Sequence, residues 1–96
     1  RTIAVTGRRL EVNYATSAIG SVTFELCDVD GNPINGFSMS DSETLFGNEI
    51  SHIVSWNDDS DVSPMAGDPV RLRVRLHDAD LYAVRFPKES AGAKNE

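Results

Sequence analysis

The sequence contains a single cysteine, Cys27, so it can form neither an internal disulfide nor a zinc site built from several cysteines. No apolar run approaches the roughly 20 residues that a membrane-spanning helix needs, and there is no Asn-x-Ser/Thr sequon. Lysine and arginine (9) are outnumbered by aspartate and glutamate (15), which leaves a net charge of −6. Because this charge repels phosphate backbones and anionic lipid surfaces, we expect no nucleic-acid partner and no membrane partner.

Side chains that commonly perform catalysis are also scarce. His52 and His77 are the only histidines, and both fall on the polar side or at the end of an expected strand. No serine or cysteine stands in a nucleophile motif, and no pair of carboxylates has a spacing typical of acid–base chemistry. We therefore expect that this chain is not itself an enzyme.

The length of 96 residues suits one domain with its own core. The chain starts at Arg1, without a methionine, and enters strand-like sequence at once, so we interpret it as a fragment of a longer polypeptide. Pro87 ends the last expected strand, and small polar residues follow it. We predict a domain over residues 1–86 and a flexible tail over residues 87–96.

The clearest pattern is an unbroken alternation of apolar and charged residues from 70 to 76. Only an extended strand places every second side chain on one face, so Val70, Leu72, Val74 and Leu76 should line a core while the arginines face solvent. The same alternation in other stretches predicts further core residues. These are Leu10, Val12, Tyr14, Val22, Phe24, Leu26, Tyr82, Val84 and Phe86.

Turn-forming residues separate these strands. A break is expected at Gly20, a hairpin turn at residues 28–33 with a short strand at 34–38 after it, and a tight turn at residues 78–80. Residues 39–48 read as a long loop with Leu45 and Phe46 tucked in, and residues 63–67 as one helical turn. Because no long helical period intervenes, we predict an all-β fold, an antiparallel two-sheet β-sandwich of jelly-roll type with about seven to eight strands.

The stretch from Asp28 to Asn32 resembles the opening of a calcium-binding EF-hand loop. However, Pro33 occupies the sixth position, where that loop needs glycine, and Met39 the twelfth, where it needs glutamate. An ordinary hairpin turn is the better interpretation.

A second acidic loop follows the only tryptophan. Asn57, Asp59 and Asp61, with Asp58 between them, could supply oxygen ligands to calcium, or they could simply be solvated turn formers. Trp56 together with Asn57, Asp59 and Asp61 is also a candidate carbohydrate site, because sugar rings stack on exposed aromatic faces. The alternative is that Trp56 fills the edge of the core.

Three interpretations apply to the ladder of Arg71, Arg73 and Arg75. The first is cross-strand pairing with acids such as Glu11 or Glu25. The second is docking against another domain, and the third is recognition of carboxylated or sulfated sugars through paired N–H donors.

The order of segments is similar to that of a known module. Residues 7–22 (GRRLEVNYATSAIGSV) resemble its opening, G-x-x-L-x-x-N-Y-x-T-S-A-x-G-S-V, and residues 28–38 (DVDGNPINGFS) resemble its second hallmark. Trp56 and residues 46–50, 60–63, 66–73 and 78–86 continue the resemblance over nearly the whole of residues 1–86. Such modules end large bacterial proteins related to glycoside hydrolases with a five-bladed propeller, the invertase and fructanase type.

This resemblance implies a β-sandwich that is appended to an upstream catalytic propeller, packs against it and stabilises it. It implies a secreted or periplasmic parent protein that acts on carbohydrate, and no cofactor apart from the possible calcium. The catalytic carboxylates would lie outside this chain, so no catalytic residue can be assigned here. The alternative function is a carbohydrate-binding module that uses Trp56 and the acidic loop.

Overall fold

The computed structural model describes residues 2–87, which form four strands and one short 3-10 helix. The strands are β1 (Thr2–Ala4), β2 (Glu11–Cys27), β3 (Asn48–Ile53) and β4 (Pro69–Arg85), and the helix η1 covers Ser63–Met65. All pairings are antiparallel, in one sheet of order β1-β4-β2-β3. The all-β antiparallel prediction is confirmed. Within residues 2–87 the architecture is one curled sheet of four strands, where the sequence predicted two sheets and about seven to eight strands.

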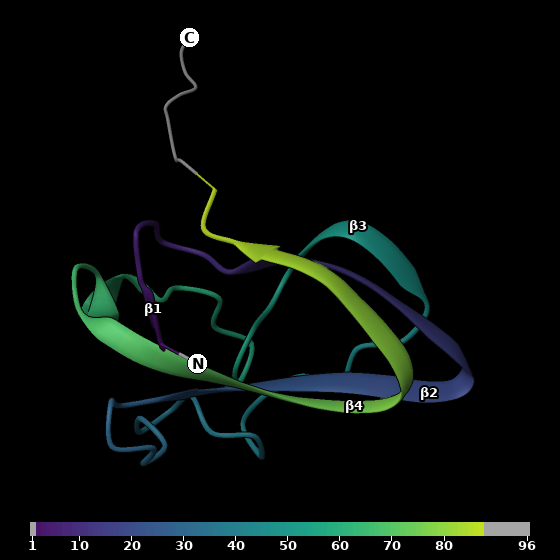
Figure 1. The fold of residues 1–96 in the computed structure, drawn as a ribbon, viewed down its shortest axis with the longest axis horizontal. Coiled ribbons are helices and arrows are strands. Elements are labelled where there is room, and N and C mark those ends of the chain that lie inside the picture. Colours follow the sequence, from purple (N-terminus) through teal and green to yellow (C-terminus); the bar gives the residue numbers. More distant parts are fainter. Residues whose placement is uncertain (1, 88–96) are drawn as a thin grey trace, which may run out of the picture.

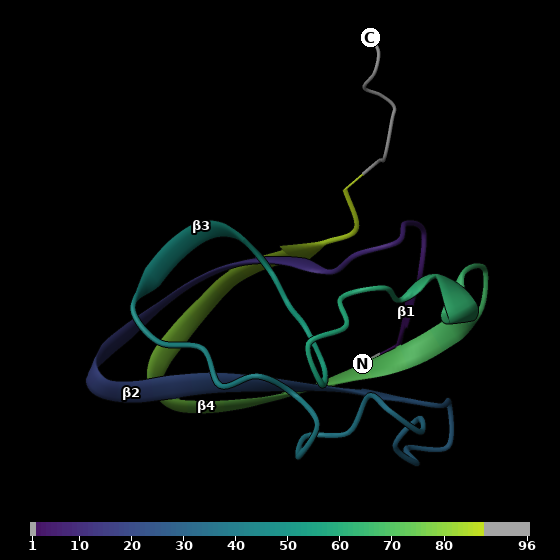
Figure 2. The same cartoon turned by 180° about the vertical axis from the view of Figure 1, so that it is seen from behind.

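The curl comes from the two long strands, which bend together. Residues 21–27 of β2 pair with residues 71–77 of β4, and residues 11–16 of β2 pair with residues 79–85 of β4. In Figure 1 the first block runs along the bottom as a lower arm, and the second returns above it as an upper arm. Figure 2 shows the same curl from behind, with β3 beside the upper arm. The folded sheet thus faces itself, as two packed sheets would.

Gly20 permits the bend. A Cβ atom at this position would lie 2.3 Å from the carbonyl oxygen of Asp78 and 2.7 Å from that of His77, so only glycine allows the strands to approach so closely. Asp78 has a left-handed φ of 46°, and the register shifts between Thr16 and Ser21. The break predicted at Gly20 and the tight turn predicted at residues 78–80 are therefore wrong. These turn-forming residues bend two continuous strands instead of ending four short ones.

A second irregularity explains where Tyr82 lies. Asn13 pairs with Ala83 and Tyr14 with Leu81, so Tyr82 is an extra residue at a bulge in β4. The bulge reverses the alternation, which puts Leu81 against the core and leaves Tyr82 63% exposed. The prediction that Tyr82 belongs to the core is wrong, because a bulge changes side-chain parity without any signal in residue type.

In the lower arm, an irregular segment lies along the edge of β2 that β4 leaves open. Backbone N–H groups of Ile34 and Leu45 donate to Leu26 and Val22 over 2.9 Å each, and Leu26 donates to Phe37 over 2.9 Å. The strand expected at residues 34–38 does not form, and an isolated bridge between Cys27 and Pro33 stands one residue before it. Proline has no N–H to donate, and Gly36 has a φ of 89°, so the extended run cannot continue.

The turn before this segment is the predicted hairpin turn and not an EF-hand. The Asp28 carboxylate accepts the backbone N–H groups of Asp30 (2.9 Å) and Asn32 (3.0 Å), and Gly31 takes a φ of 89°. These hydrogen bonds lower the pKa of Asp28, led by the one from Asn32. The carboxylate therefore stabilises its own turn.

The core lies between the two arms. It contains all six residues that alternation predicted to be buried in β2 and just before it, namely Leu10, Val12, Tyr14, Val22, Phe24 and Leu26. The buried apolar side chains are Val5, Leu10, Val12, Tyr14, Val22, Phe24, Leu26, Leu45, Val54, Trp56, Val62, Met65 and Val70. Phe46, expected to be tucked in, is 63% exposed. Leu45 pairs with Val22 and faces inward, so its neighbour Phe46 faces outward.

The remaining expectations are met in part. The helical turn expected at residues 63–67 is present as η1, with Gly67 at a φ of 86° after it. Of the predicted tail over residues 87–96, all but Pro87 lies outside the described residues. No helix within residues 2–87 is long and apolar enough to span a membrane.

Candidate functional site

The loop after Trp56 is a tight hairpin. Trp56 and Asp59 exchange both backbone hydrogen bonds, at 2.8 and 2.9 Å, across the two residues Asn57 and Asp58. Those two residues have φ angles of 52° and 65°, the left-handed geometry that Asn and Asp tolerate in two-residue turns. Asn57 is also held from outside, since its side-chain amide donates to the Asp41 carboxylate over 3.1 Å.

Trp56 itself belongs to the core. Its side chain is 1% exposed, and its indole N–H donates to the carbonyl oxygen of Phe24 over 3.0 Å. The Phe37 ring packs edge-on against it, with 5.3 Å between ring centroids. The tryptophan therefore has no open face on which a sugar ring could stack. This is the alternative interpretation, in which the lone tryptophan fills the sheet edge.

The structure nevertheless brings all four candidate carbohydrate-binding residues to one place. Trp56, Asn57, Asp59 and Asp61 line a surface hollow of about 410 Å³. The other lining residues are Asn35, Gly36, Phe37 and Pro64. The half-buried Phe37 is the more accessible aromatic residue of this hollow. Alternation does not predict the burial of Phe37, because its position depends on how the chain returns after the turn at residues 28–32.

The carboxylates of this loop accept hydrogen bonds from the loop itself. Asp59 accepts the backbone N–H of Asp61 over 3.0 Å, and Asp61 accepts that of Ser63 over 2.9 Å. Hydrogen bonds from the side chain and backbone of Ser63 lower the pKa of Asp61. Across residues 2–87, no group of three or more His, Cys, Asp or Glu side chains is arranged to hold a metal ion. Calcium binding at this loop stays a prediction.

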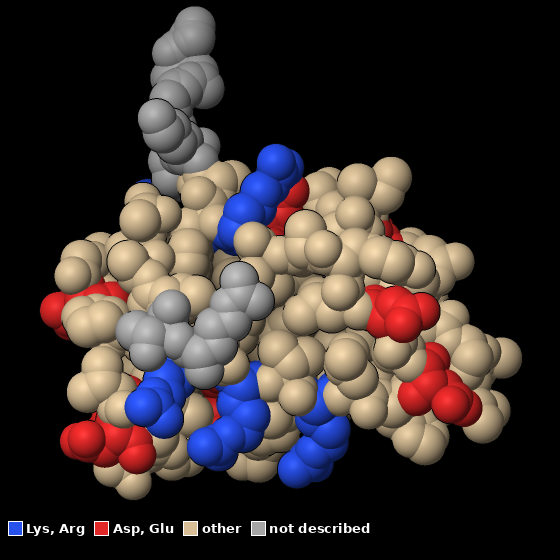
Figure 3. Space-filling model, viewed as in Figure 1, with Lys and Arg blue, Asp and Glu red and all other residues tan. Residues whose placement is uncertain are grey.

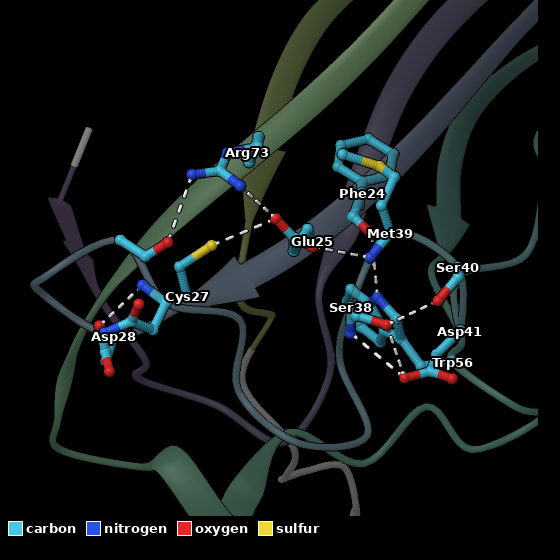
Figure 4. Close-up of polar contacts among 12 residues, drawn as sticks. Phe24, Glu25, Cys27, Asp28, Ser38, Met39, Ser40, Asp41, Trp56 and Arg73 are labelled. Carbon is cyan, nitrogen blue, oxygen red and sulfur yellow. Dashed lines mark hydrogen bonds and ion pairs between the residues drawn. The ribbon is translucent and has the colours of Figure 1, made fainter.

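A buried carboxylate, Glu25, organises the outer side of the lower arm (Figure 4). It is 5% exposed and accepts hydrogen bonds from Arg73 (2.7 Å), the backbone of Met39 (2.9 Å) and the Cys27 thiol (3.4 Å). The hydrogen bond from Met39 is the main reason that the pKa of Glu25 falls below its ordinary value. Burial raises the pKa of the Cys27 thiol, which makes it a poor nucleophile at neutral pH.

The arginine ladder faces solvent, as predicted, and pairs only in part. Figure 3 shows a row of blue side chains over the first half of β4, where Arg71, Arg73 and Arg75 lie. Arg73 pairs with Glu25, which confirms the cross-strand interpretation for that residue. Glu11 pairs instead with Arg85, over 2.6 Å, because their backbones face each other in the upper arm. Among residues 2–87, Arg71 and Arg75 have no ion-pair partner.

One polar cluster was not foreseen from the sequence. The Glu43 carboxylate accepts the backbone N–H (2.8 Å) and the hydroxyl (3.0 Å) of Ser55, and it lies 3.1 Å from the Nε2 atom of His52. In a catalytic triad the histidine stands between serine and carboxylate. Here the Glu43 carboxylate stands between the other two side chains, and it accepts the hydrogen bond of the Ser55 hydroxyl. The cluster fastens residues 52–55 to the loop at Glu43 and does not activate the hydroxyl.

Comparison of the chain with protein-family models, with curated proteins and with solved structures finds no match. The functional argument therefore rests on surfaces and contacts.

Proposed function

We propose that this domain is a non-catalytic accessory module that packs against a neighbouring domain of a longer polypeptide and stabilises it. The observation that carries this proposal is the exposure of large apolar side chains at the bend and in the upper arm. Ile50 is 81% exposed, Ile19 75%, and Phe46 and Tyr82 63% each. Single exposed apolar residues are ordinary, but several large ones that are more than half exposed in a small domain are typical of a contact surface.

We give the name bend patch to three of these side chains, Ile19, Phe46 and Ile50, which we propose that one neighbouring domain covers together. Ile19 lies in the bend of β2, Phe46 lies just before β3, and Ile50 lies within β3. Thr16 and Gly47 exchange hydrogen bonds of 2.9 and 2.8 Å, and the Tyr14 hydroxyl donates to the carbonyl oxygen of Phe46 over 2.8 Å. The patch is therefore carried on fixed backbone, so docking would require little additional ordering.

The proposed class of neighbour is supported by the resemblance of residues 1–86 to a module of propeller-type glycoside hydrolases. We propose a secreted or periplasmic carbohydrate-active polypeptide in which an upstream catalytic domain covers the bend patch and part of the upper arm. Extra strands contributed there would complete the two-sheet sandwich that the sequence predicts. In this arrangement the domain supplies packing surface and no chemistry.

Hydrogen exchange tests this proposal by comparing the longer polypeptide with the isolated domain. We expect slower amide exchange at residues 16–20 and 46–50 in the longer polypeptide. A double variant, Ile19→Ser with Ile50→Ser, should abolish the difference and lower the melting temperature of the longer polypeptide by several degrees. The matched control is Val29→Ser, which alters a 46% exposed apolar residue in the turn after β2. Equal exchange rates in the two proteins would contradict the proposal.

A second candidate function, carbohydrate binding, is favoured by the hollow beside Trp56. Its wall combines carboxylates at Asp59 and Asp61, side-chain amides at Asn35 and Asn57, and the half-buried ring of Phe37. Sugar hydroxyls donate hydrogen bonds to such carboxylates, and sugar C–H faces pack on aromatic rings. The proposed ligand is a neutral sugar, since acidic sugars would meet an acidic rim.

A glycan array separates this candidate from the docking module. Because Trp56 is buried, its replacement would disturb the fold and could not report on binding. The informative variants are Phe37→Ala and Asp61→Asn, with Asp30→Asn in the distant turn as control. A defined sugar that binds the unaltered domain and is lost in the first two variants would establish carbohydrate binding, and a blank array would reject it.

A further inference from the structure

Two residues with a carbonyl group at Cγ are followed directly by glycine, and the structure holds the two pairs differently. Asp30 precedes Gly31, and Asn35 precedes Gly36. In such a pair the backbone nitrogen of glycine can bond to Cγ of the residue before it, because glycine has no Cβ to obstruct the ring that forms. Asparagine is the more labile of the two, since it releases neutral ammonia. Whether a pair reacts then depends on what holds the glycine nitrogen.

The first pair is held inside the turn after β2. The Gly31 N–H donates to the carbonyl oxygen of Asp28 over 3.0 Å, and the Asp30 N–H donates to the Asp28 carboxylate over 2.9 Å. To reach Cγ of Asp30, the Gly31 nitrogen would have to give up its hydrogen bond and turn away from Asp28. The hydrogen bonds that stabilise the turn therefore also protect this pair.

The second pair occupies the centre of a tighter turn and is not held in this way. The Phe37 N–H donates to the carbonyl oxygen of Ile34 over 2.9 Å, which places Asn35 and Gly36 at the two central positions. Within residues 2–87, neither the Gly36 N–H nor the Asn35 side chain makes a hydrogen bond. The attacking nitrogen and the carbon that it attacks are therefore both unrestrained.

The peptide bond between Asn35 and Gly36 also has room to rotate. The common turn types differ in the orientation of this central peptide, so it can turn over while the hydrogen bond from Phe37 to Ile34 is kept. No described atom lies within 4 Å of the position that a Cβ at Gly36 would take. This rotation brings the Gly36 nitrogen toward Cγ of Asn35. Because Asn35 is exposed, water also reaches the site.

Other asparagines in the loops lack one of these conditions. The side-chain amide of Asn57 donates to the Asp41 carboxylate over 3.1 Å, which holds it away from the backbone that follows. Asn32 is followed by Pro33, whose nitrogen carries no proton to lose. The combination of a following glycine, a free nitrogen and an unbonded side chain therefore distinguishes Asn35.

We propose that Asn35 is a site of spontaneous deamidation in the wall of the hollow beside Trp56. The Gly36 nitrogen loses its proton and bonds to Cγ of Asn35. The bond from Cγ to the side-chain nitrogen breaks, and this nitrogen takes up a proton and leaves as ammonia. Water then opens the succinimide ring. Attack of water at Cγ restores the main chain and gives aspartate, whereas attack at the backbone carbonyl gives isoaspartate, in which the main chain runs through Cγ.

The reaction changes the chemistry of the hollow, whether or not the hollow binds a sugar. An amide that donates and accepts hydrogen bonds becomes a carboxylate that only accepts them. The wall then carries three carboxylates, the new one with those of Asp59 and Asp61, and the chain gains one negative charge beyond its −6. Isoaspartate also lengthens the backbone of the turn that leads to Phe37. The charge and shape of this surface thus depend on the age of the molecule.

The experiment incubates the folded domain at mildly alkaline pH, which favours loss of the amide proton, and follows acidic species by ion-exchange chromatography. Peptide mapping by mass spectrometry should locate the conversion at Asn35, as aspartate and isoaspartate, with little isoaspartate at Asp30. In Asn35→Gln the acidic species should be lost, because glutamine would have to form a larger ring. Circular dichroism should be the same for this variant, since the Asn35 side chain is exposed and unbonded.

A second incubation in denaturant tests the structural part of the argument. Unfolding removes the hydrogen bonds that hold Gly31, so isoaspartate formation at Asp30 should rise by a larger factor than conversion at Asn35. No acidic species from the folded domain, conversion mainly at another asparagine, or unchanged acidic species in Asn35→Gln would overturn the proposal. An equal rise at both pairs in denaturant would also overturn it, because the turns would then make no difference.

Discussion

The two long strands pair with each other along both arms, yet they differ in how completely they are buried. On β2 the inward side chains are buried in both arms, at Val12 and Tyr14 in the upper arm and at Val22, Phe24 and Leu26 in the lower arm. On β4 the inward side chains of Leu72, Val74, Leu81 and Val84 are only partly buried, and Leu76 is 48% exposed. Because both strands belong to the same ladder, pairing alone does not bury a strand.

The cover of the lower arm comes from segments that are not strands. Residues 33–45 lie along one edge of β2, and Trp56 adds the largest buried side chain. In the upper arm β3 lies along the same edge of β2, and most of its residues are exposed. This exposure, together with that of Ile19 and Phe46, is the reason that we propose a docking role for the upper arm and the bend.

Replacing Trp56 should cause the largest loss of stability, because Trp56 is the largest side chain that is fully buried among the described residues. Trp56→Ala should lower the free energy of unfolding by about 3–5 kcal/mol, most of the stability of a small domain. Urea denaturation followed by circular dichroism measures this loss. Trp56→Phe is the matched control, since it keeps a ring but leaves the carbonyl oxygen of Phe24 without its indole donor. That variant should lose clearly less stability, and an equal loss would mean that the hydrogen bond rather than packing dominates.

A change at Gly20 should destabilise the bend between the two arms without altering a core side chain of either arm. In Gly20→Ala the new methyl group meets the backbone of Asp78, which cannot rotate away as a side chain could. We expect a loss of about 1–3 kcal/mol, the usual range for overpacking. The control is Gly47→Ala, where no atom lies within 4 Å but φ is 83°, so the loss should be about 1 kcal/mol of backbone strain. Wild-type stability in Gly20→Ala would show that the strands can bend elsewhere.

The two buried glutamates allow the outer faces of the two arms to be compared, since Glu25 lies in the lower arm and Glu11 in the upper arm. Glu25 accepts hydrogen bonds from three residues, whereas within residues 2–87 the Glu11 side chain accepts them from Arg85 alone. Glu25→Gln should therefore lower the free energy of unfolding by about 2 kcal/mol, and Glu11→Gln by about 1 kcal/mol. Chemical denaturation of the two single variants at neutral pH tests the order. A larger loss in Glu11→Gln would contradict it.

The pH dependence of stability tests the same carboxylate. Because the folded-state pKa of Glu25 lies below its ordinary value of 4.5, the unfolded state takes up the proton first as pH falls. The stabilisation is therefore complete above pH 4.5 and is lost as pH falls toward the folded-state pKa. The stability difference between wild type and Glu25→Gln should shrink over that acidic range. A difference that stays constant would exclude the ionised carboxylate as its source.

Alternation alone predicted the inward side chains of β2, and Leu10 before it, correctly, because apolar and polar residues alternate there along extended backbone. The continuity of β2 and β4 was missed, since Gly20 and Asp78 have the composition of turns and only the opposed carbonyl groups reveal a shared bend. Tyr82 was misplaced because a bulge depends on register with another strand.

For the candidate site, the acidic loop was recognisable from its residue types, and the structure places its members around one hollow. The burial of Trp56 was one of two interpretations that the sequence left open. The choice depends on contacts with Phe24 and Phe37, and Phe24 lies 32 residues away along the chain.

The smallest losses of stability should come from replacing exposed apolar side chains of the upper arm. Tyr82→Ala and Ile50→Ser, made singly in the isolated domain, should each change the free energy of unfolding by less than about 0.5 kcal/mol, because neither side chain is covered. Thermal and urea denaturation would measure both. A loss near 2 kcal/mol in either variant would mean that these side chains serve the fold itself. The upper arm would then be complete as it stands, and its apolar surface would no longer argue for a partner.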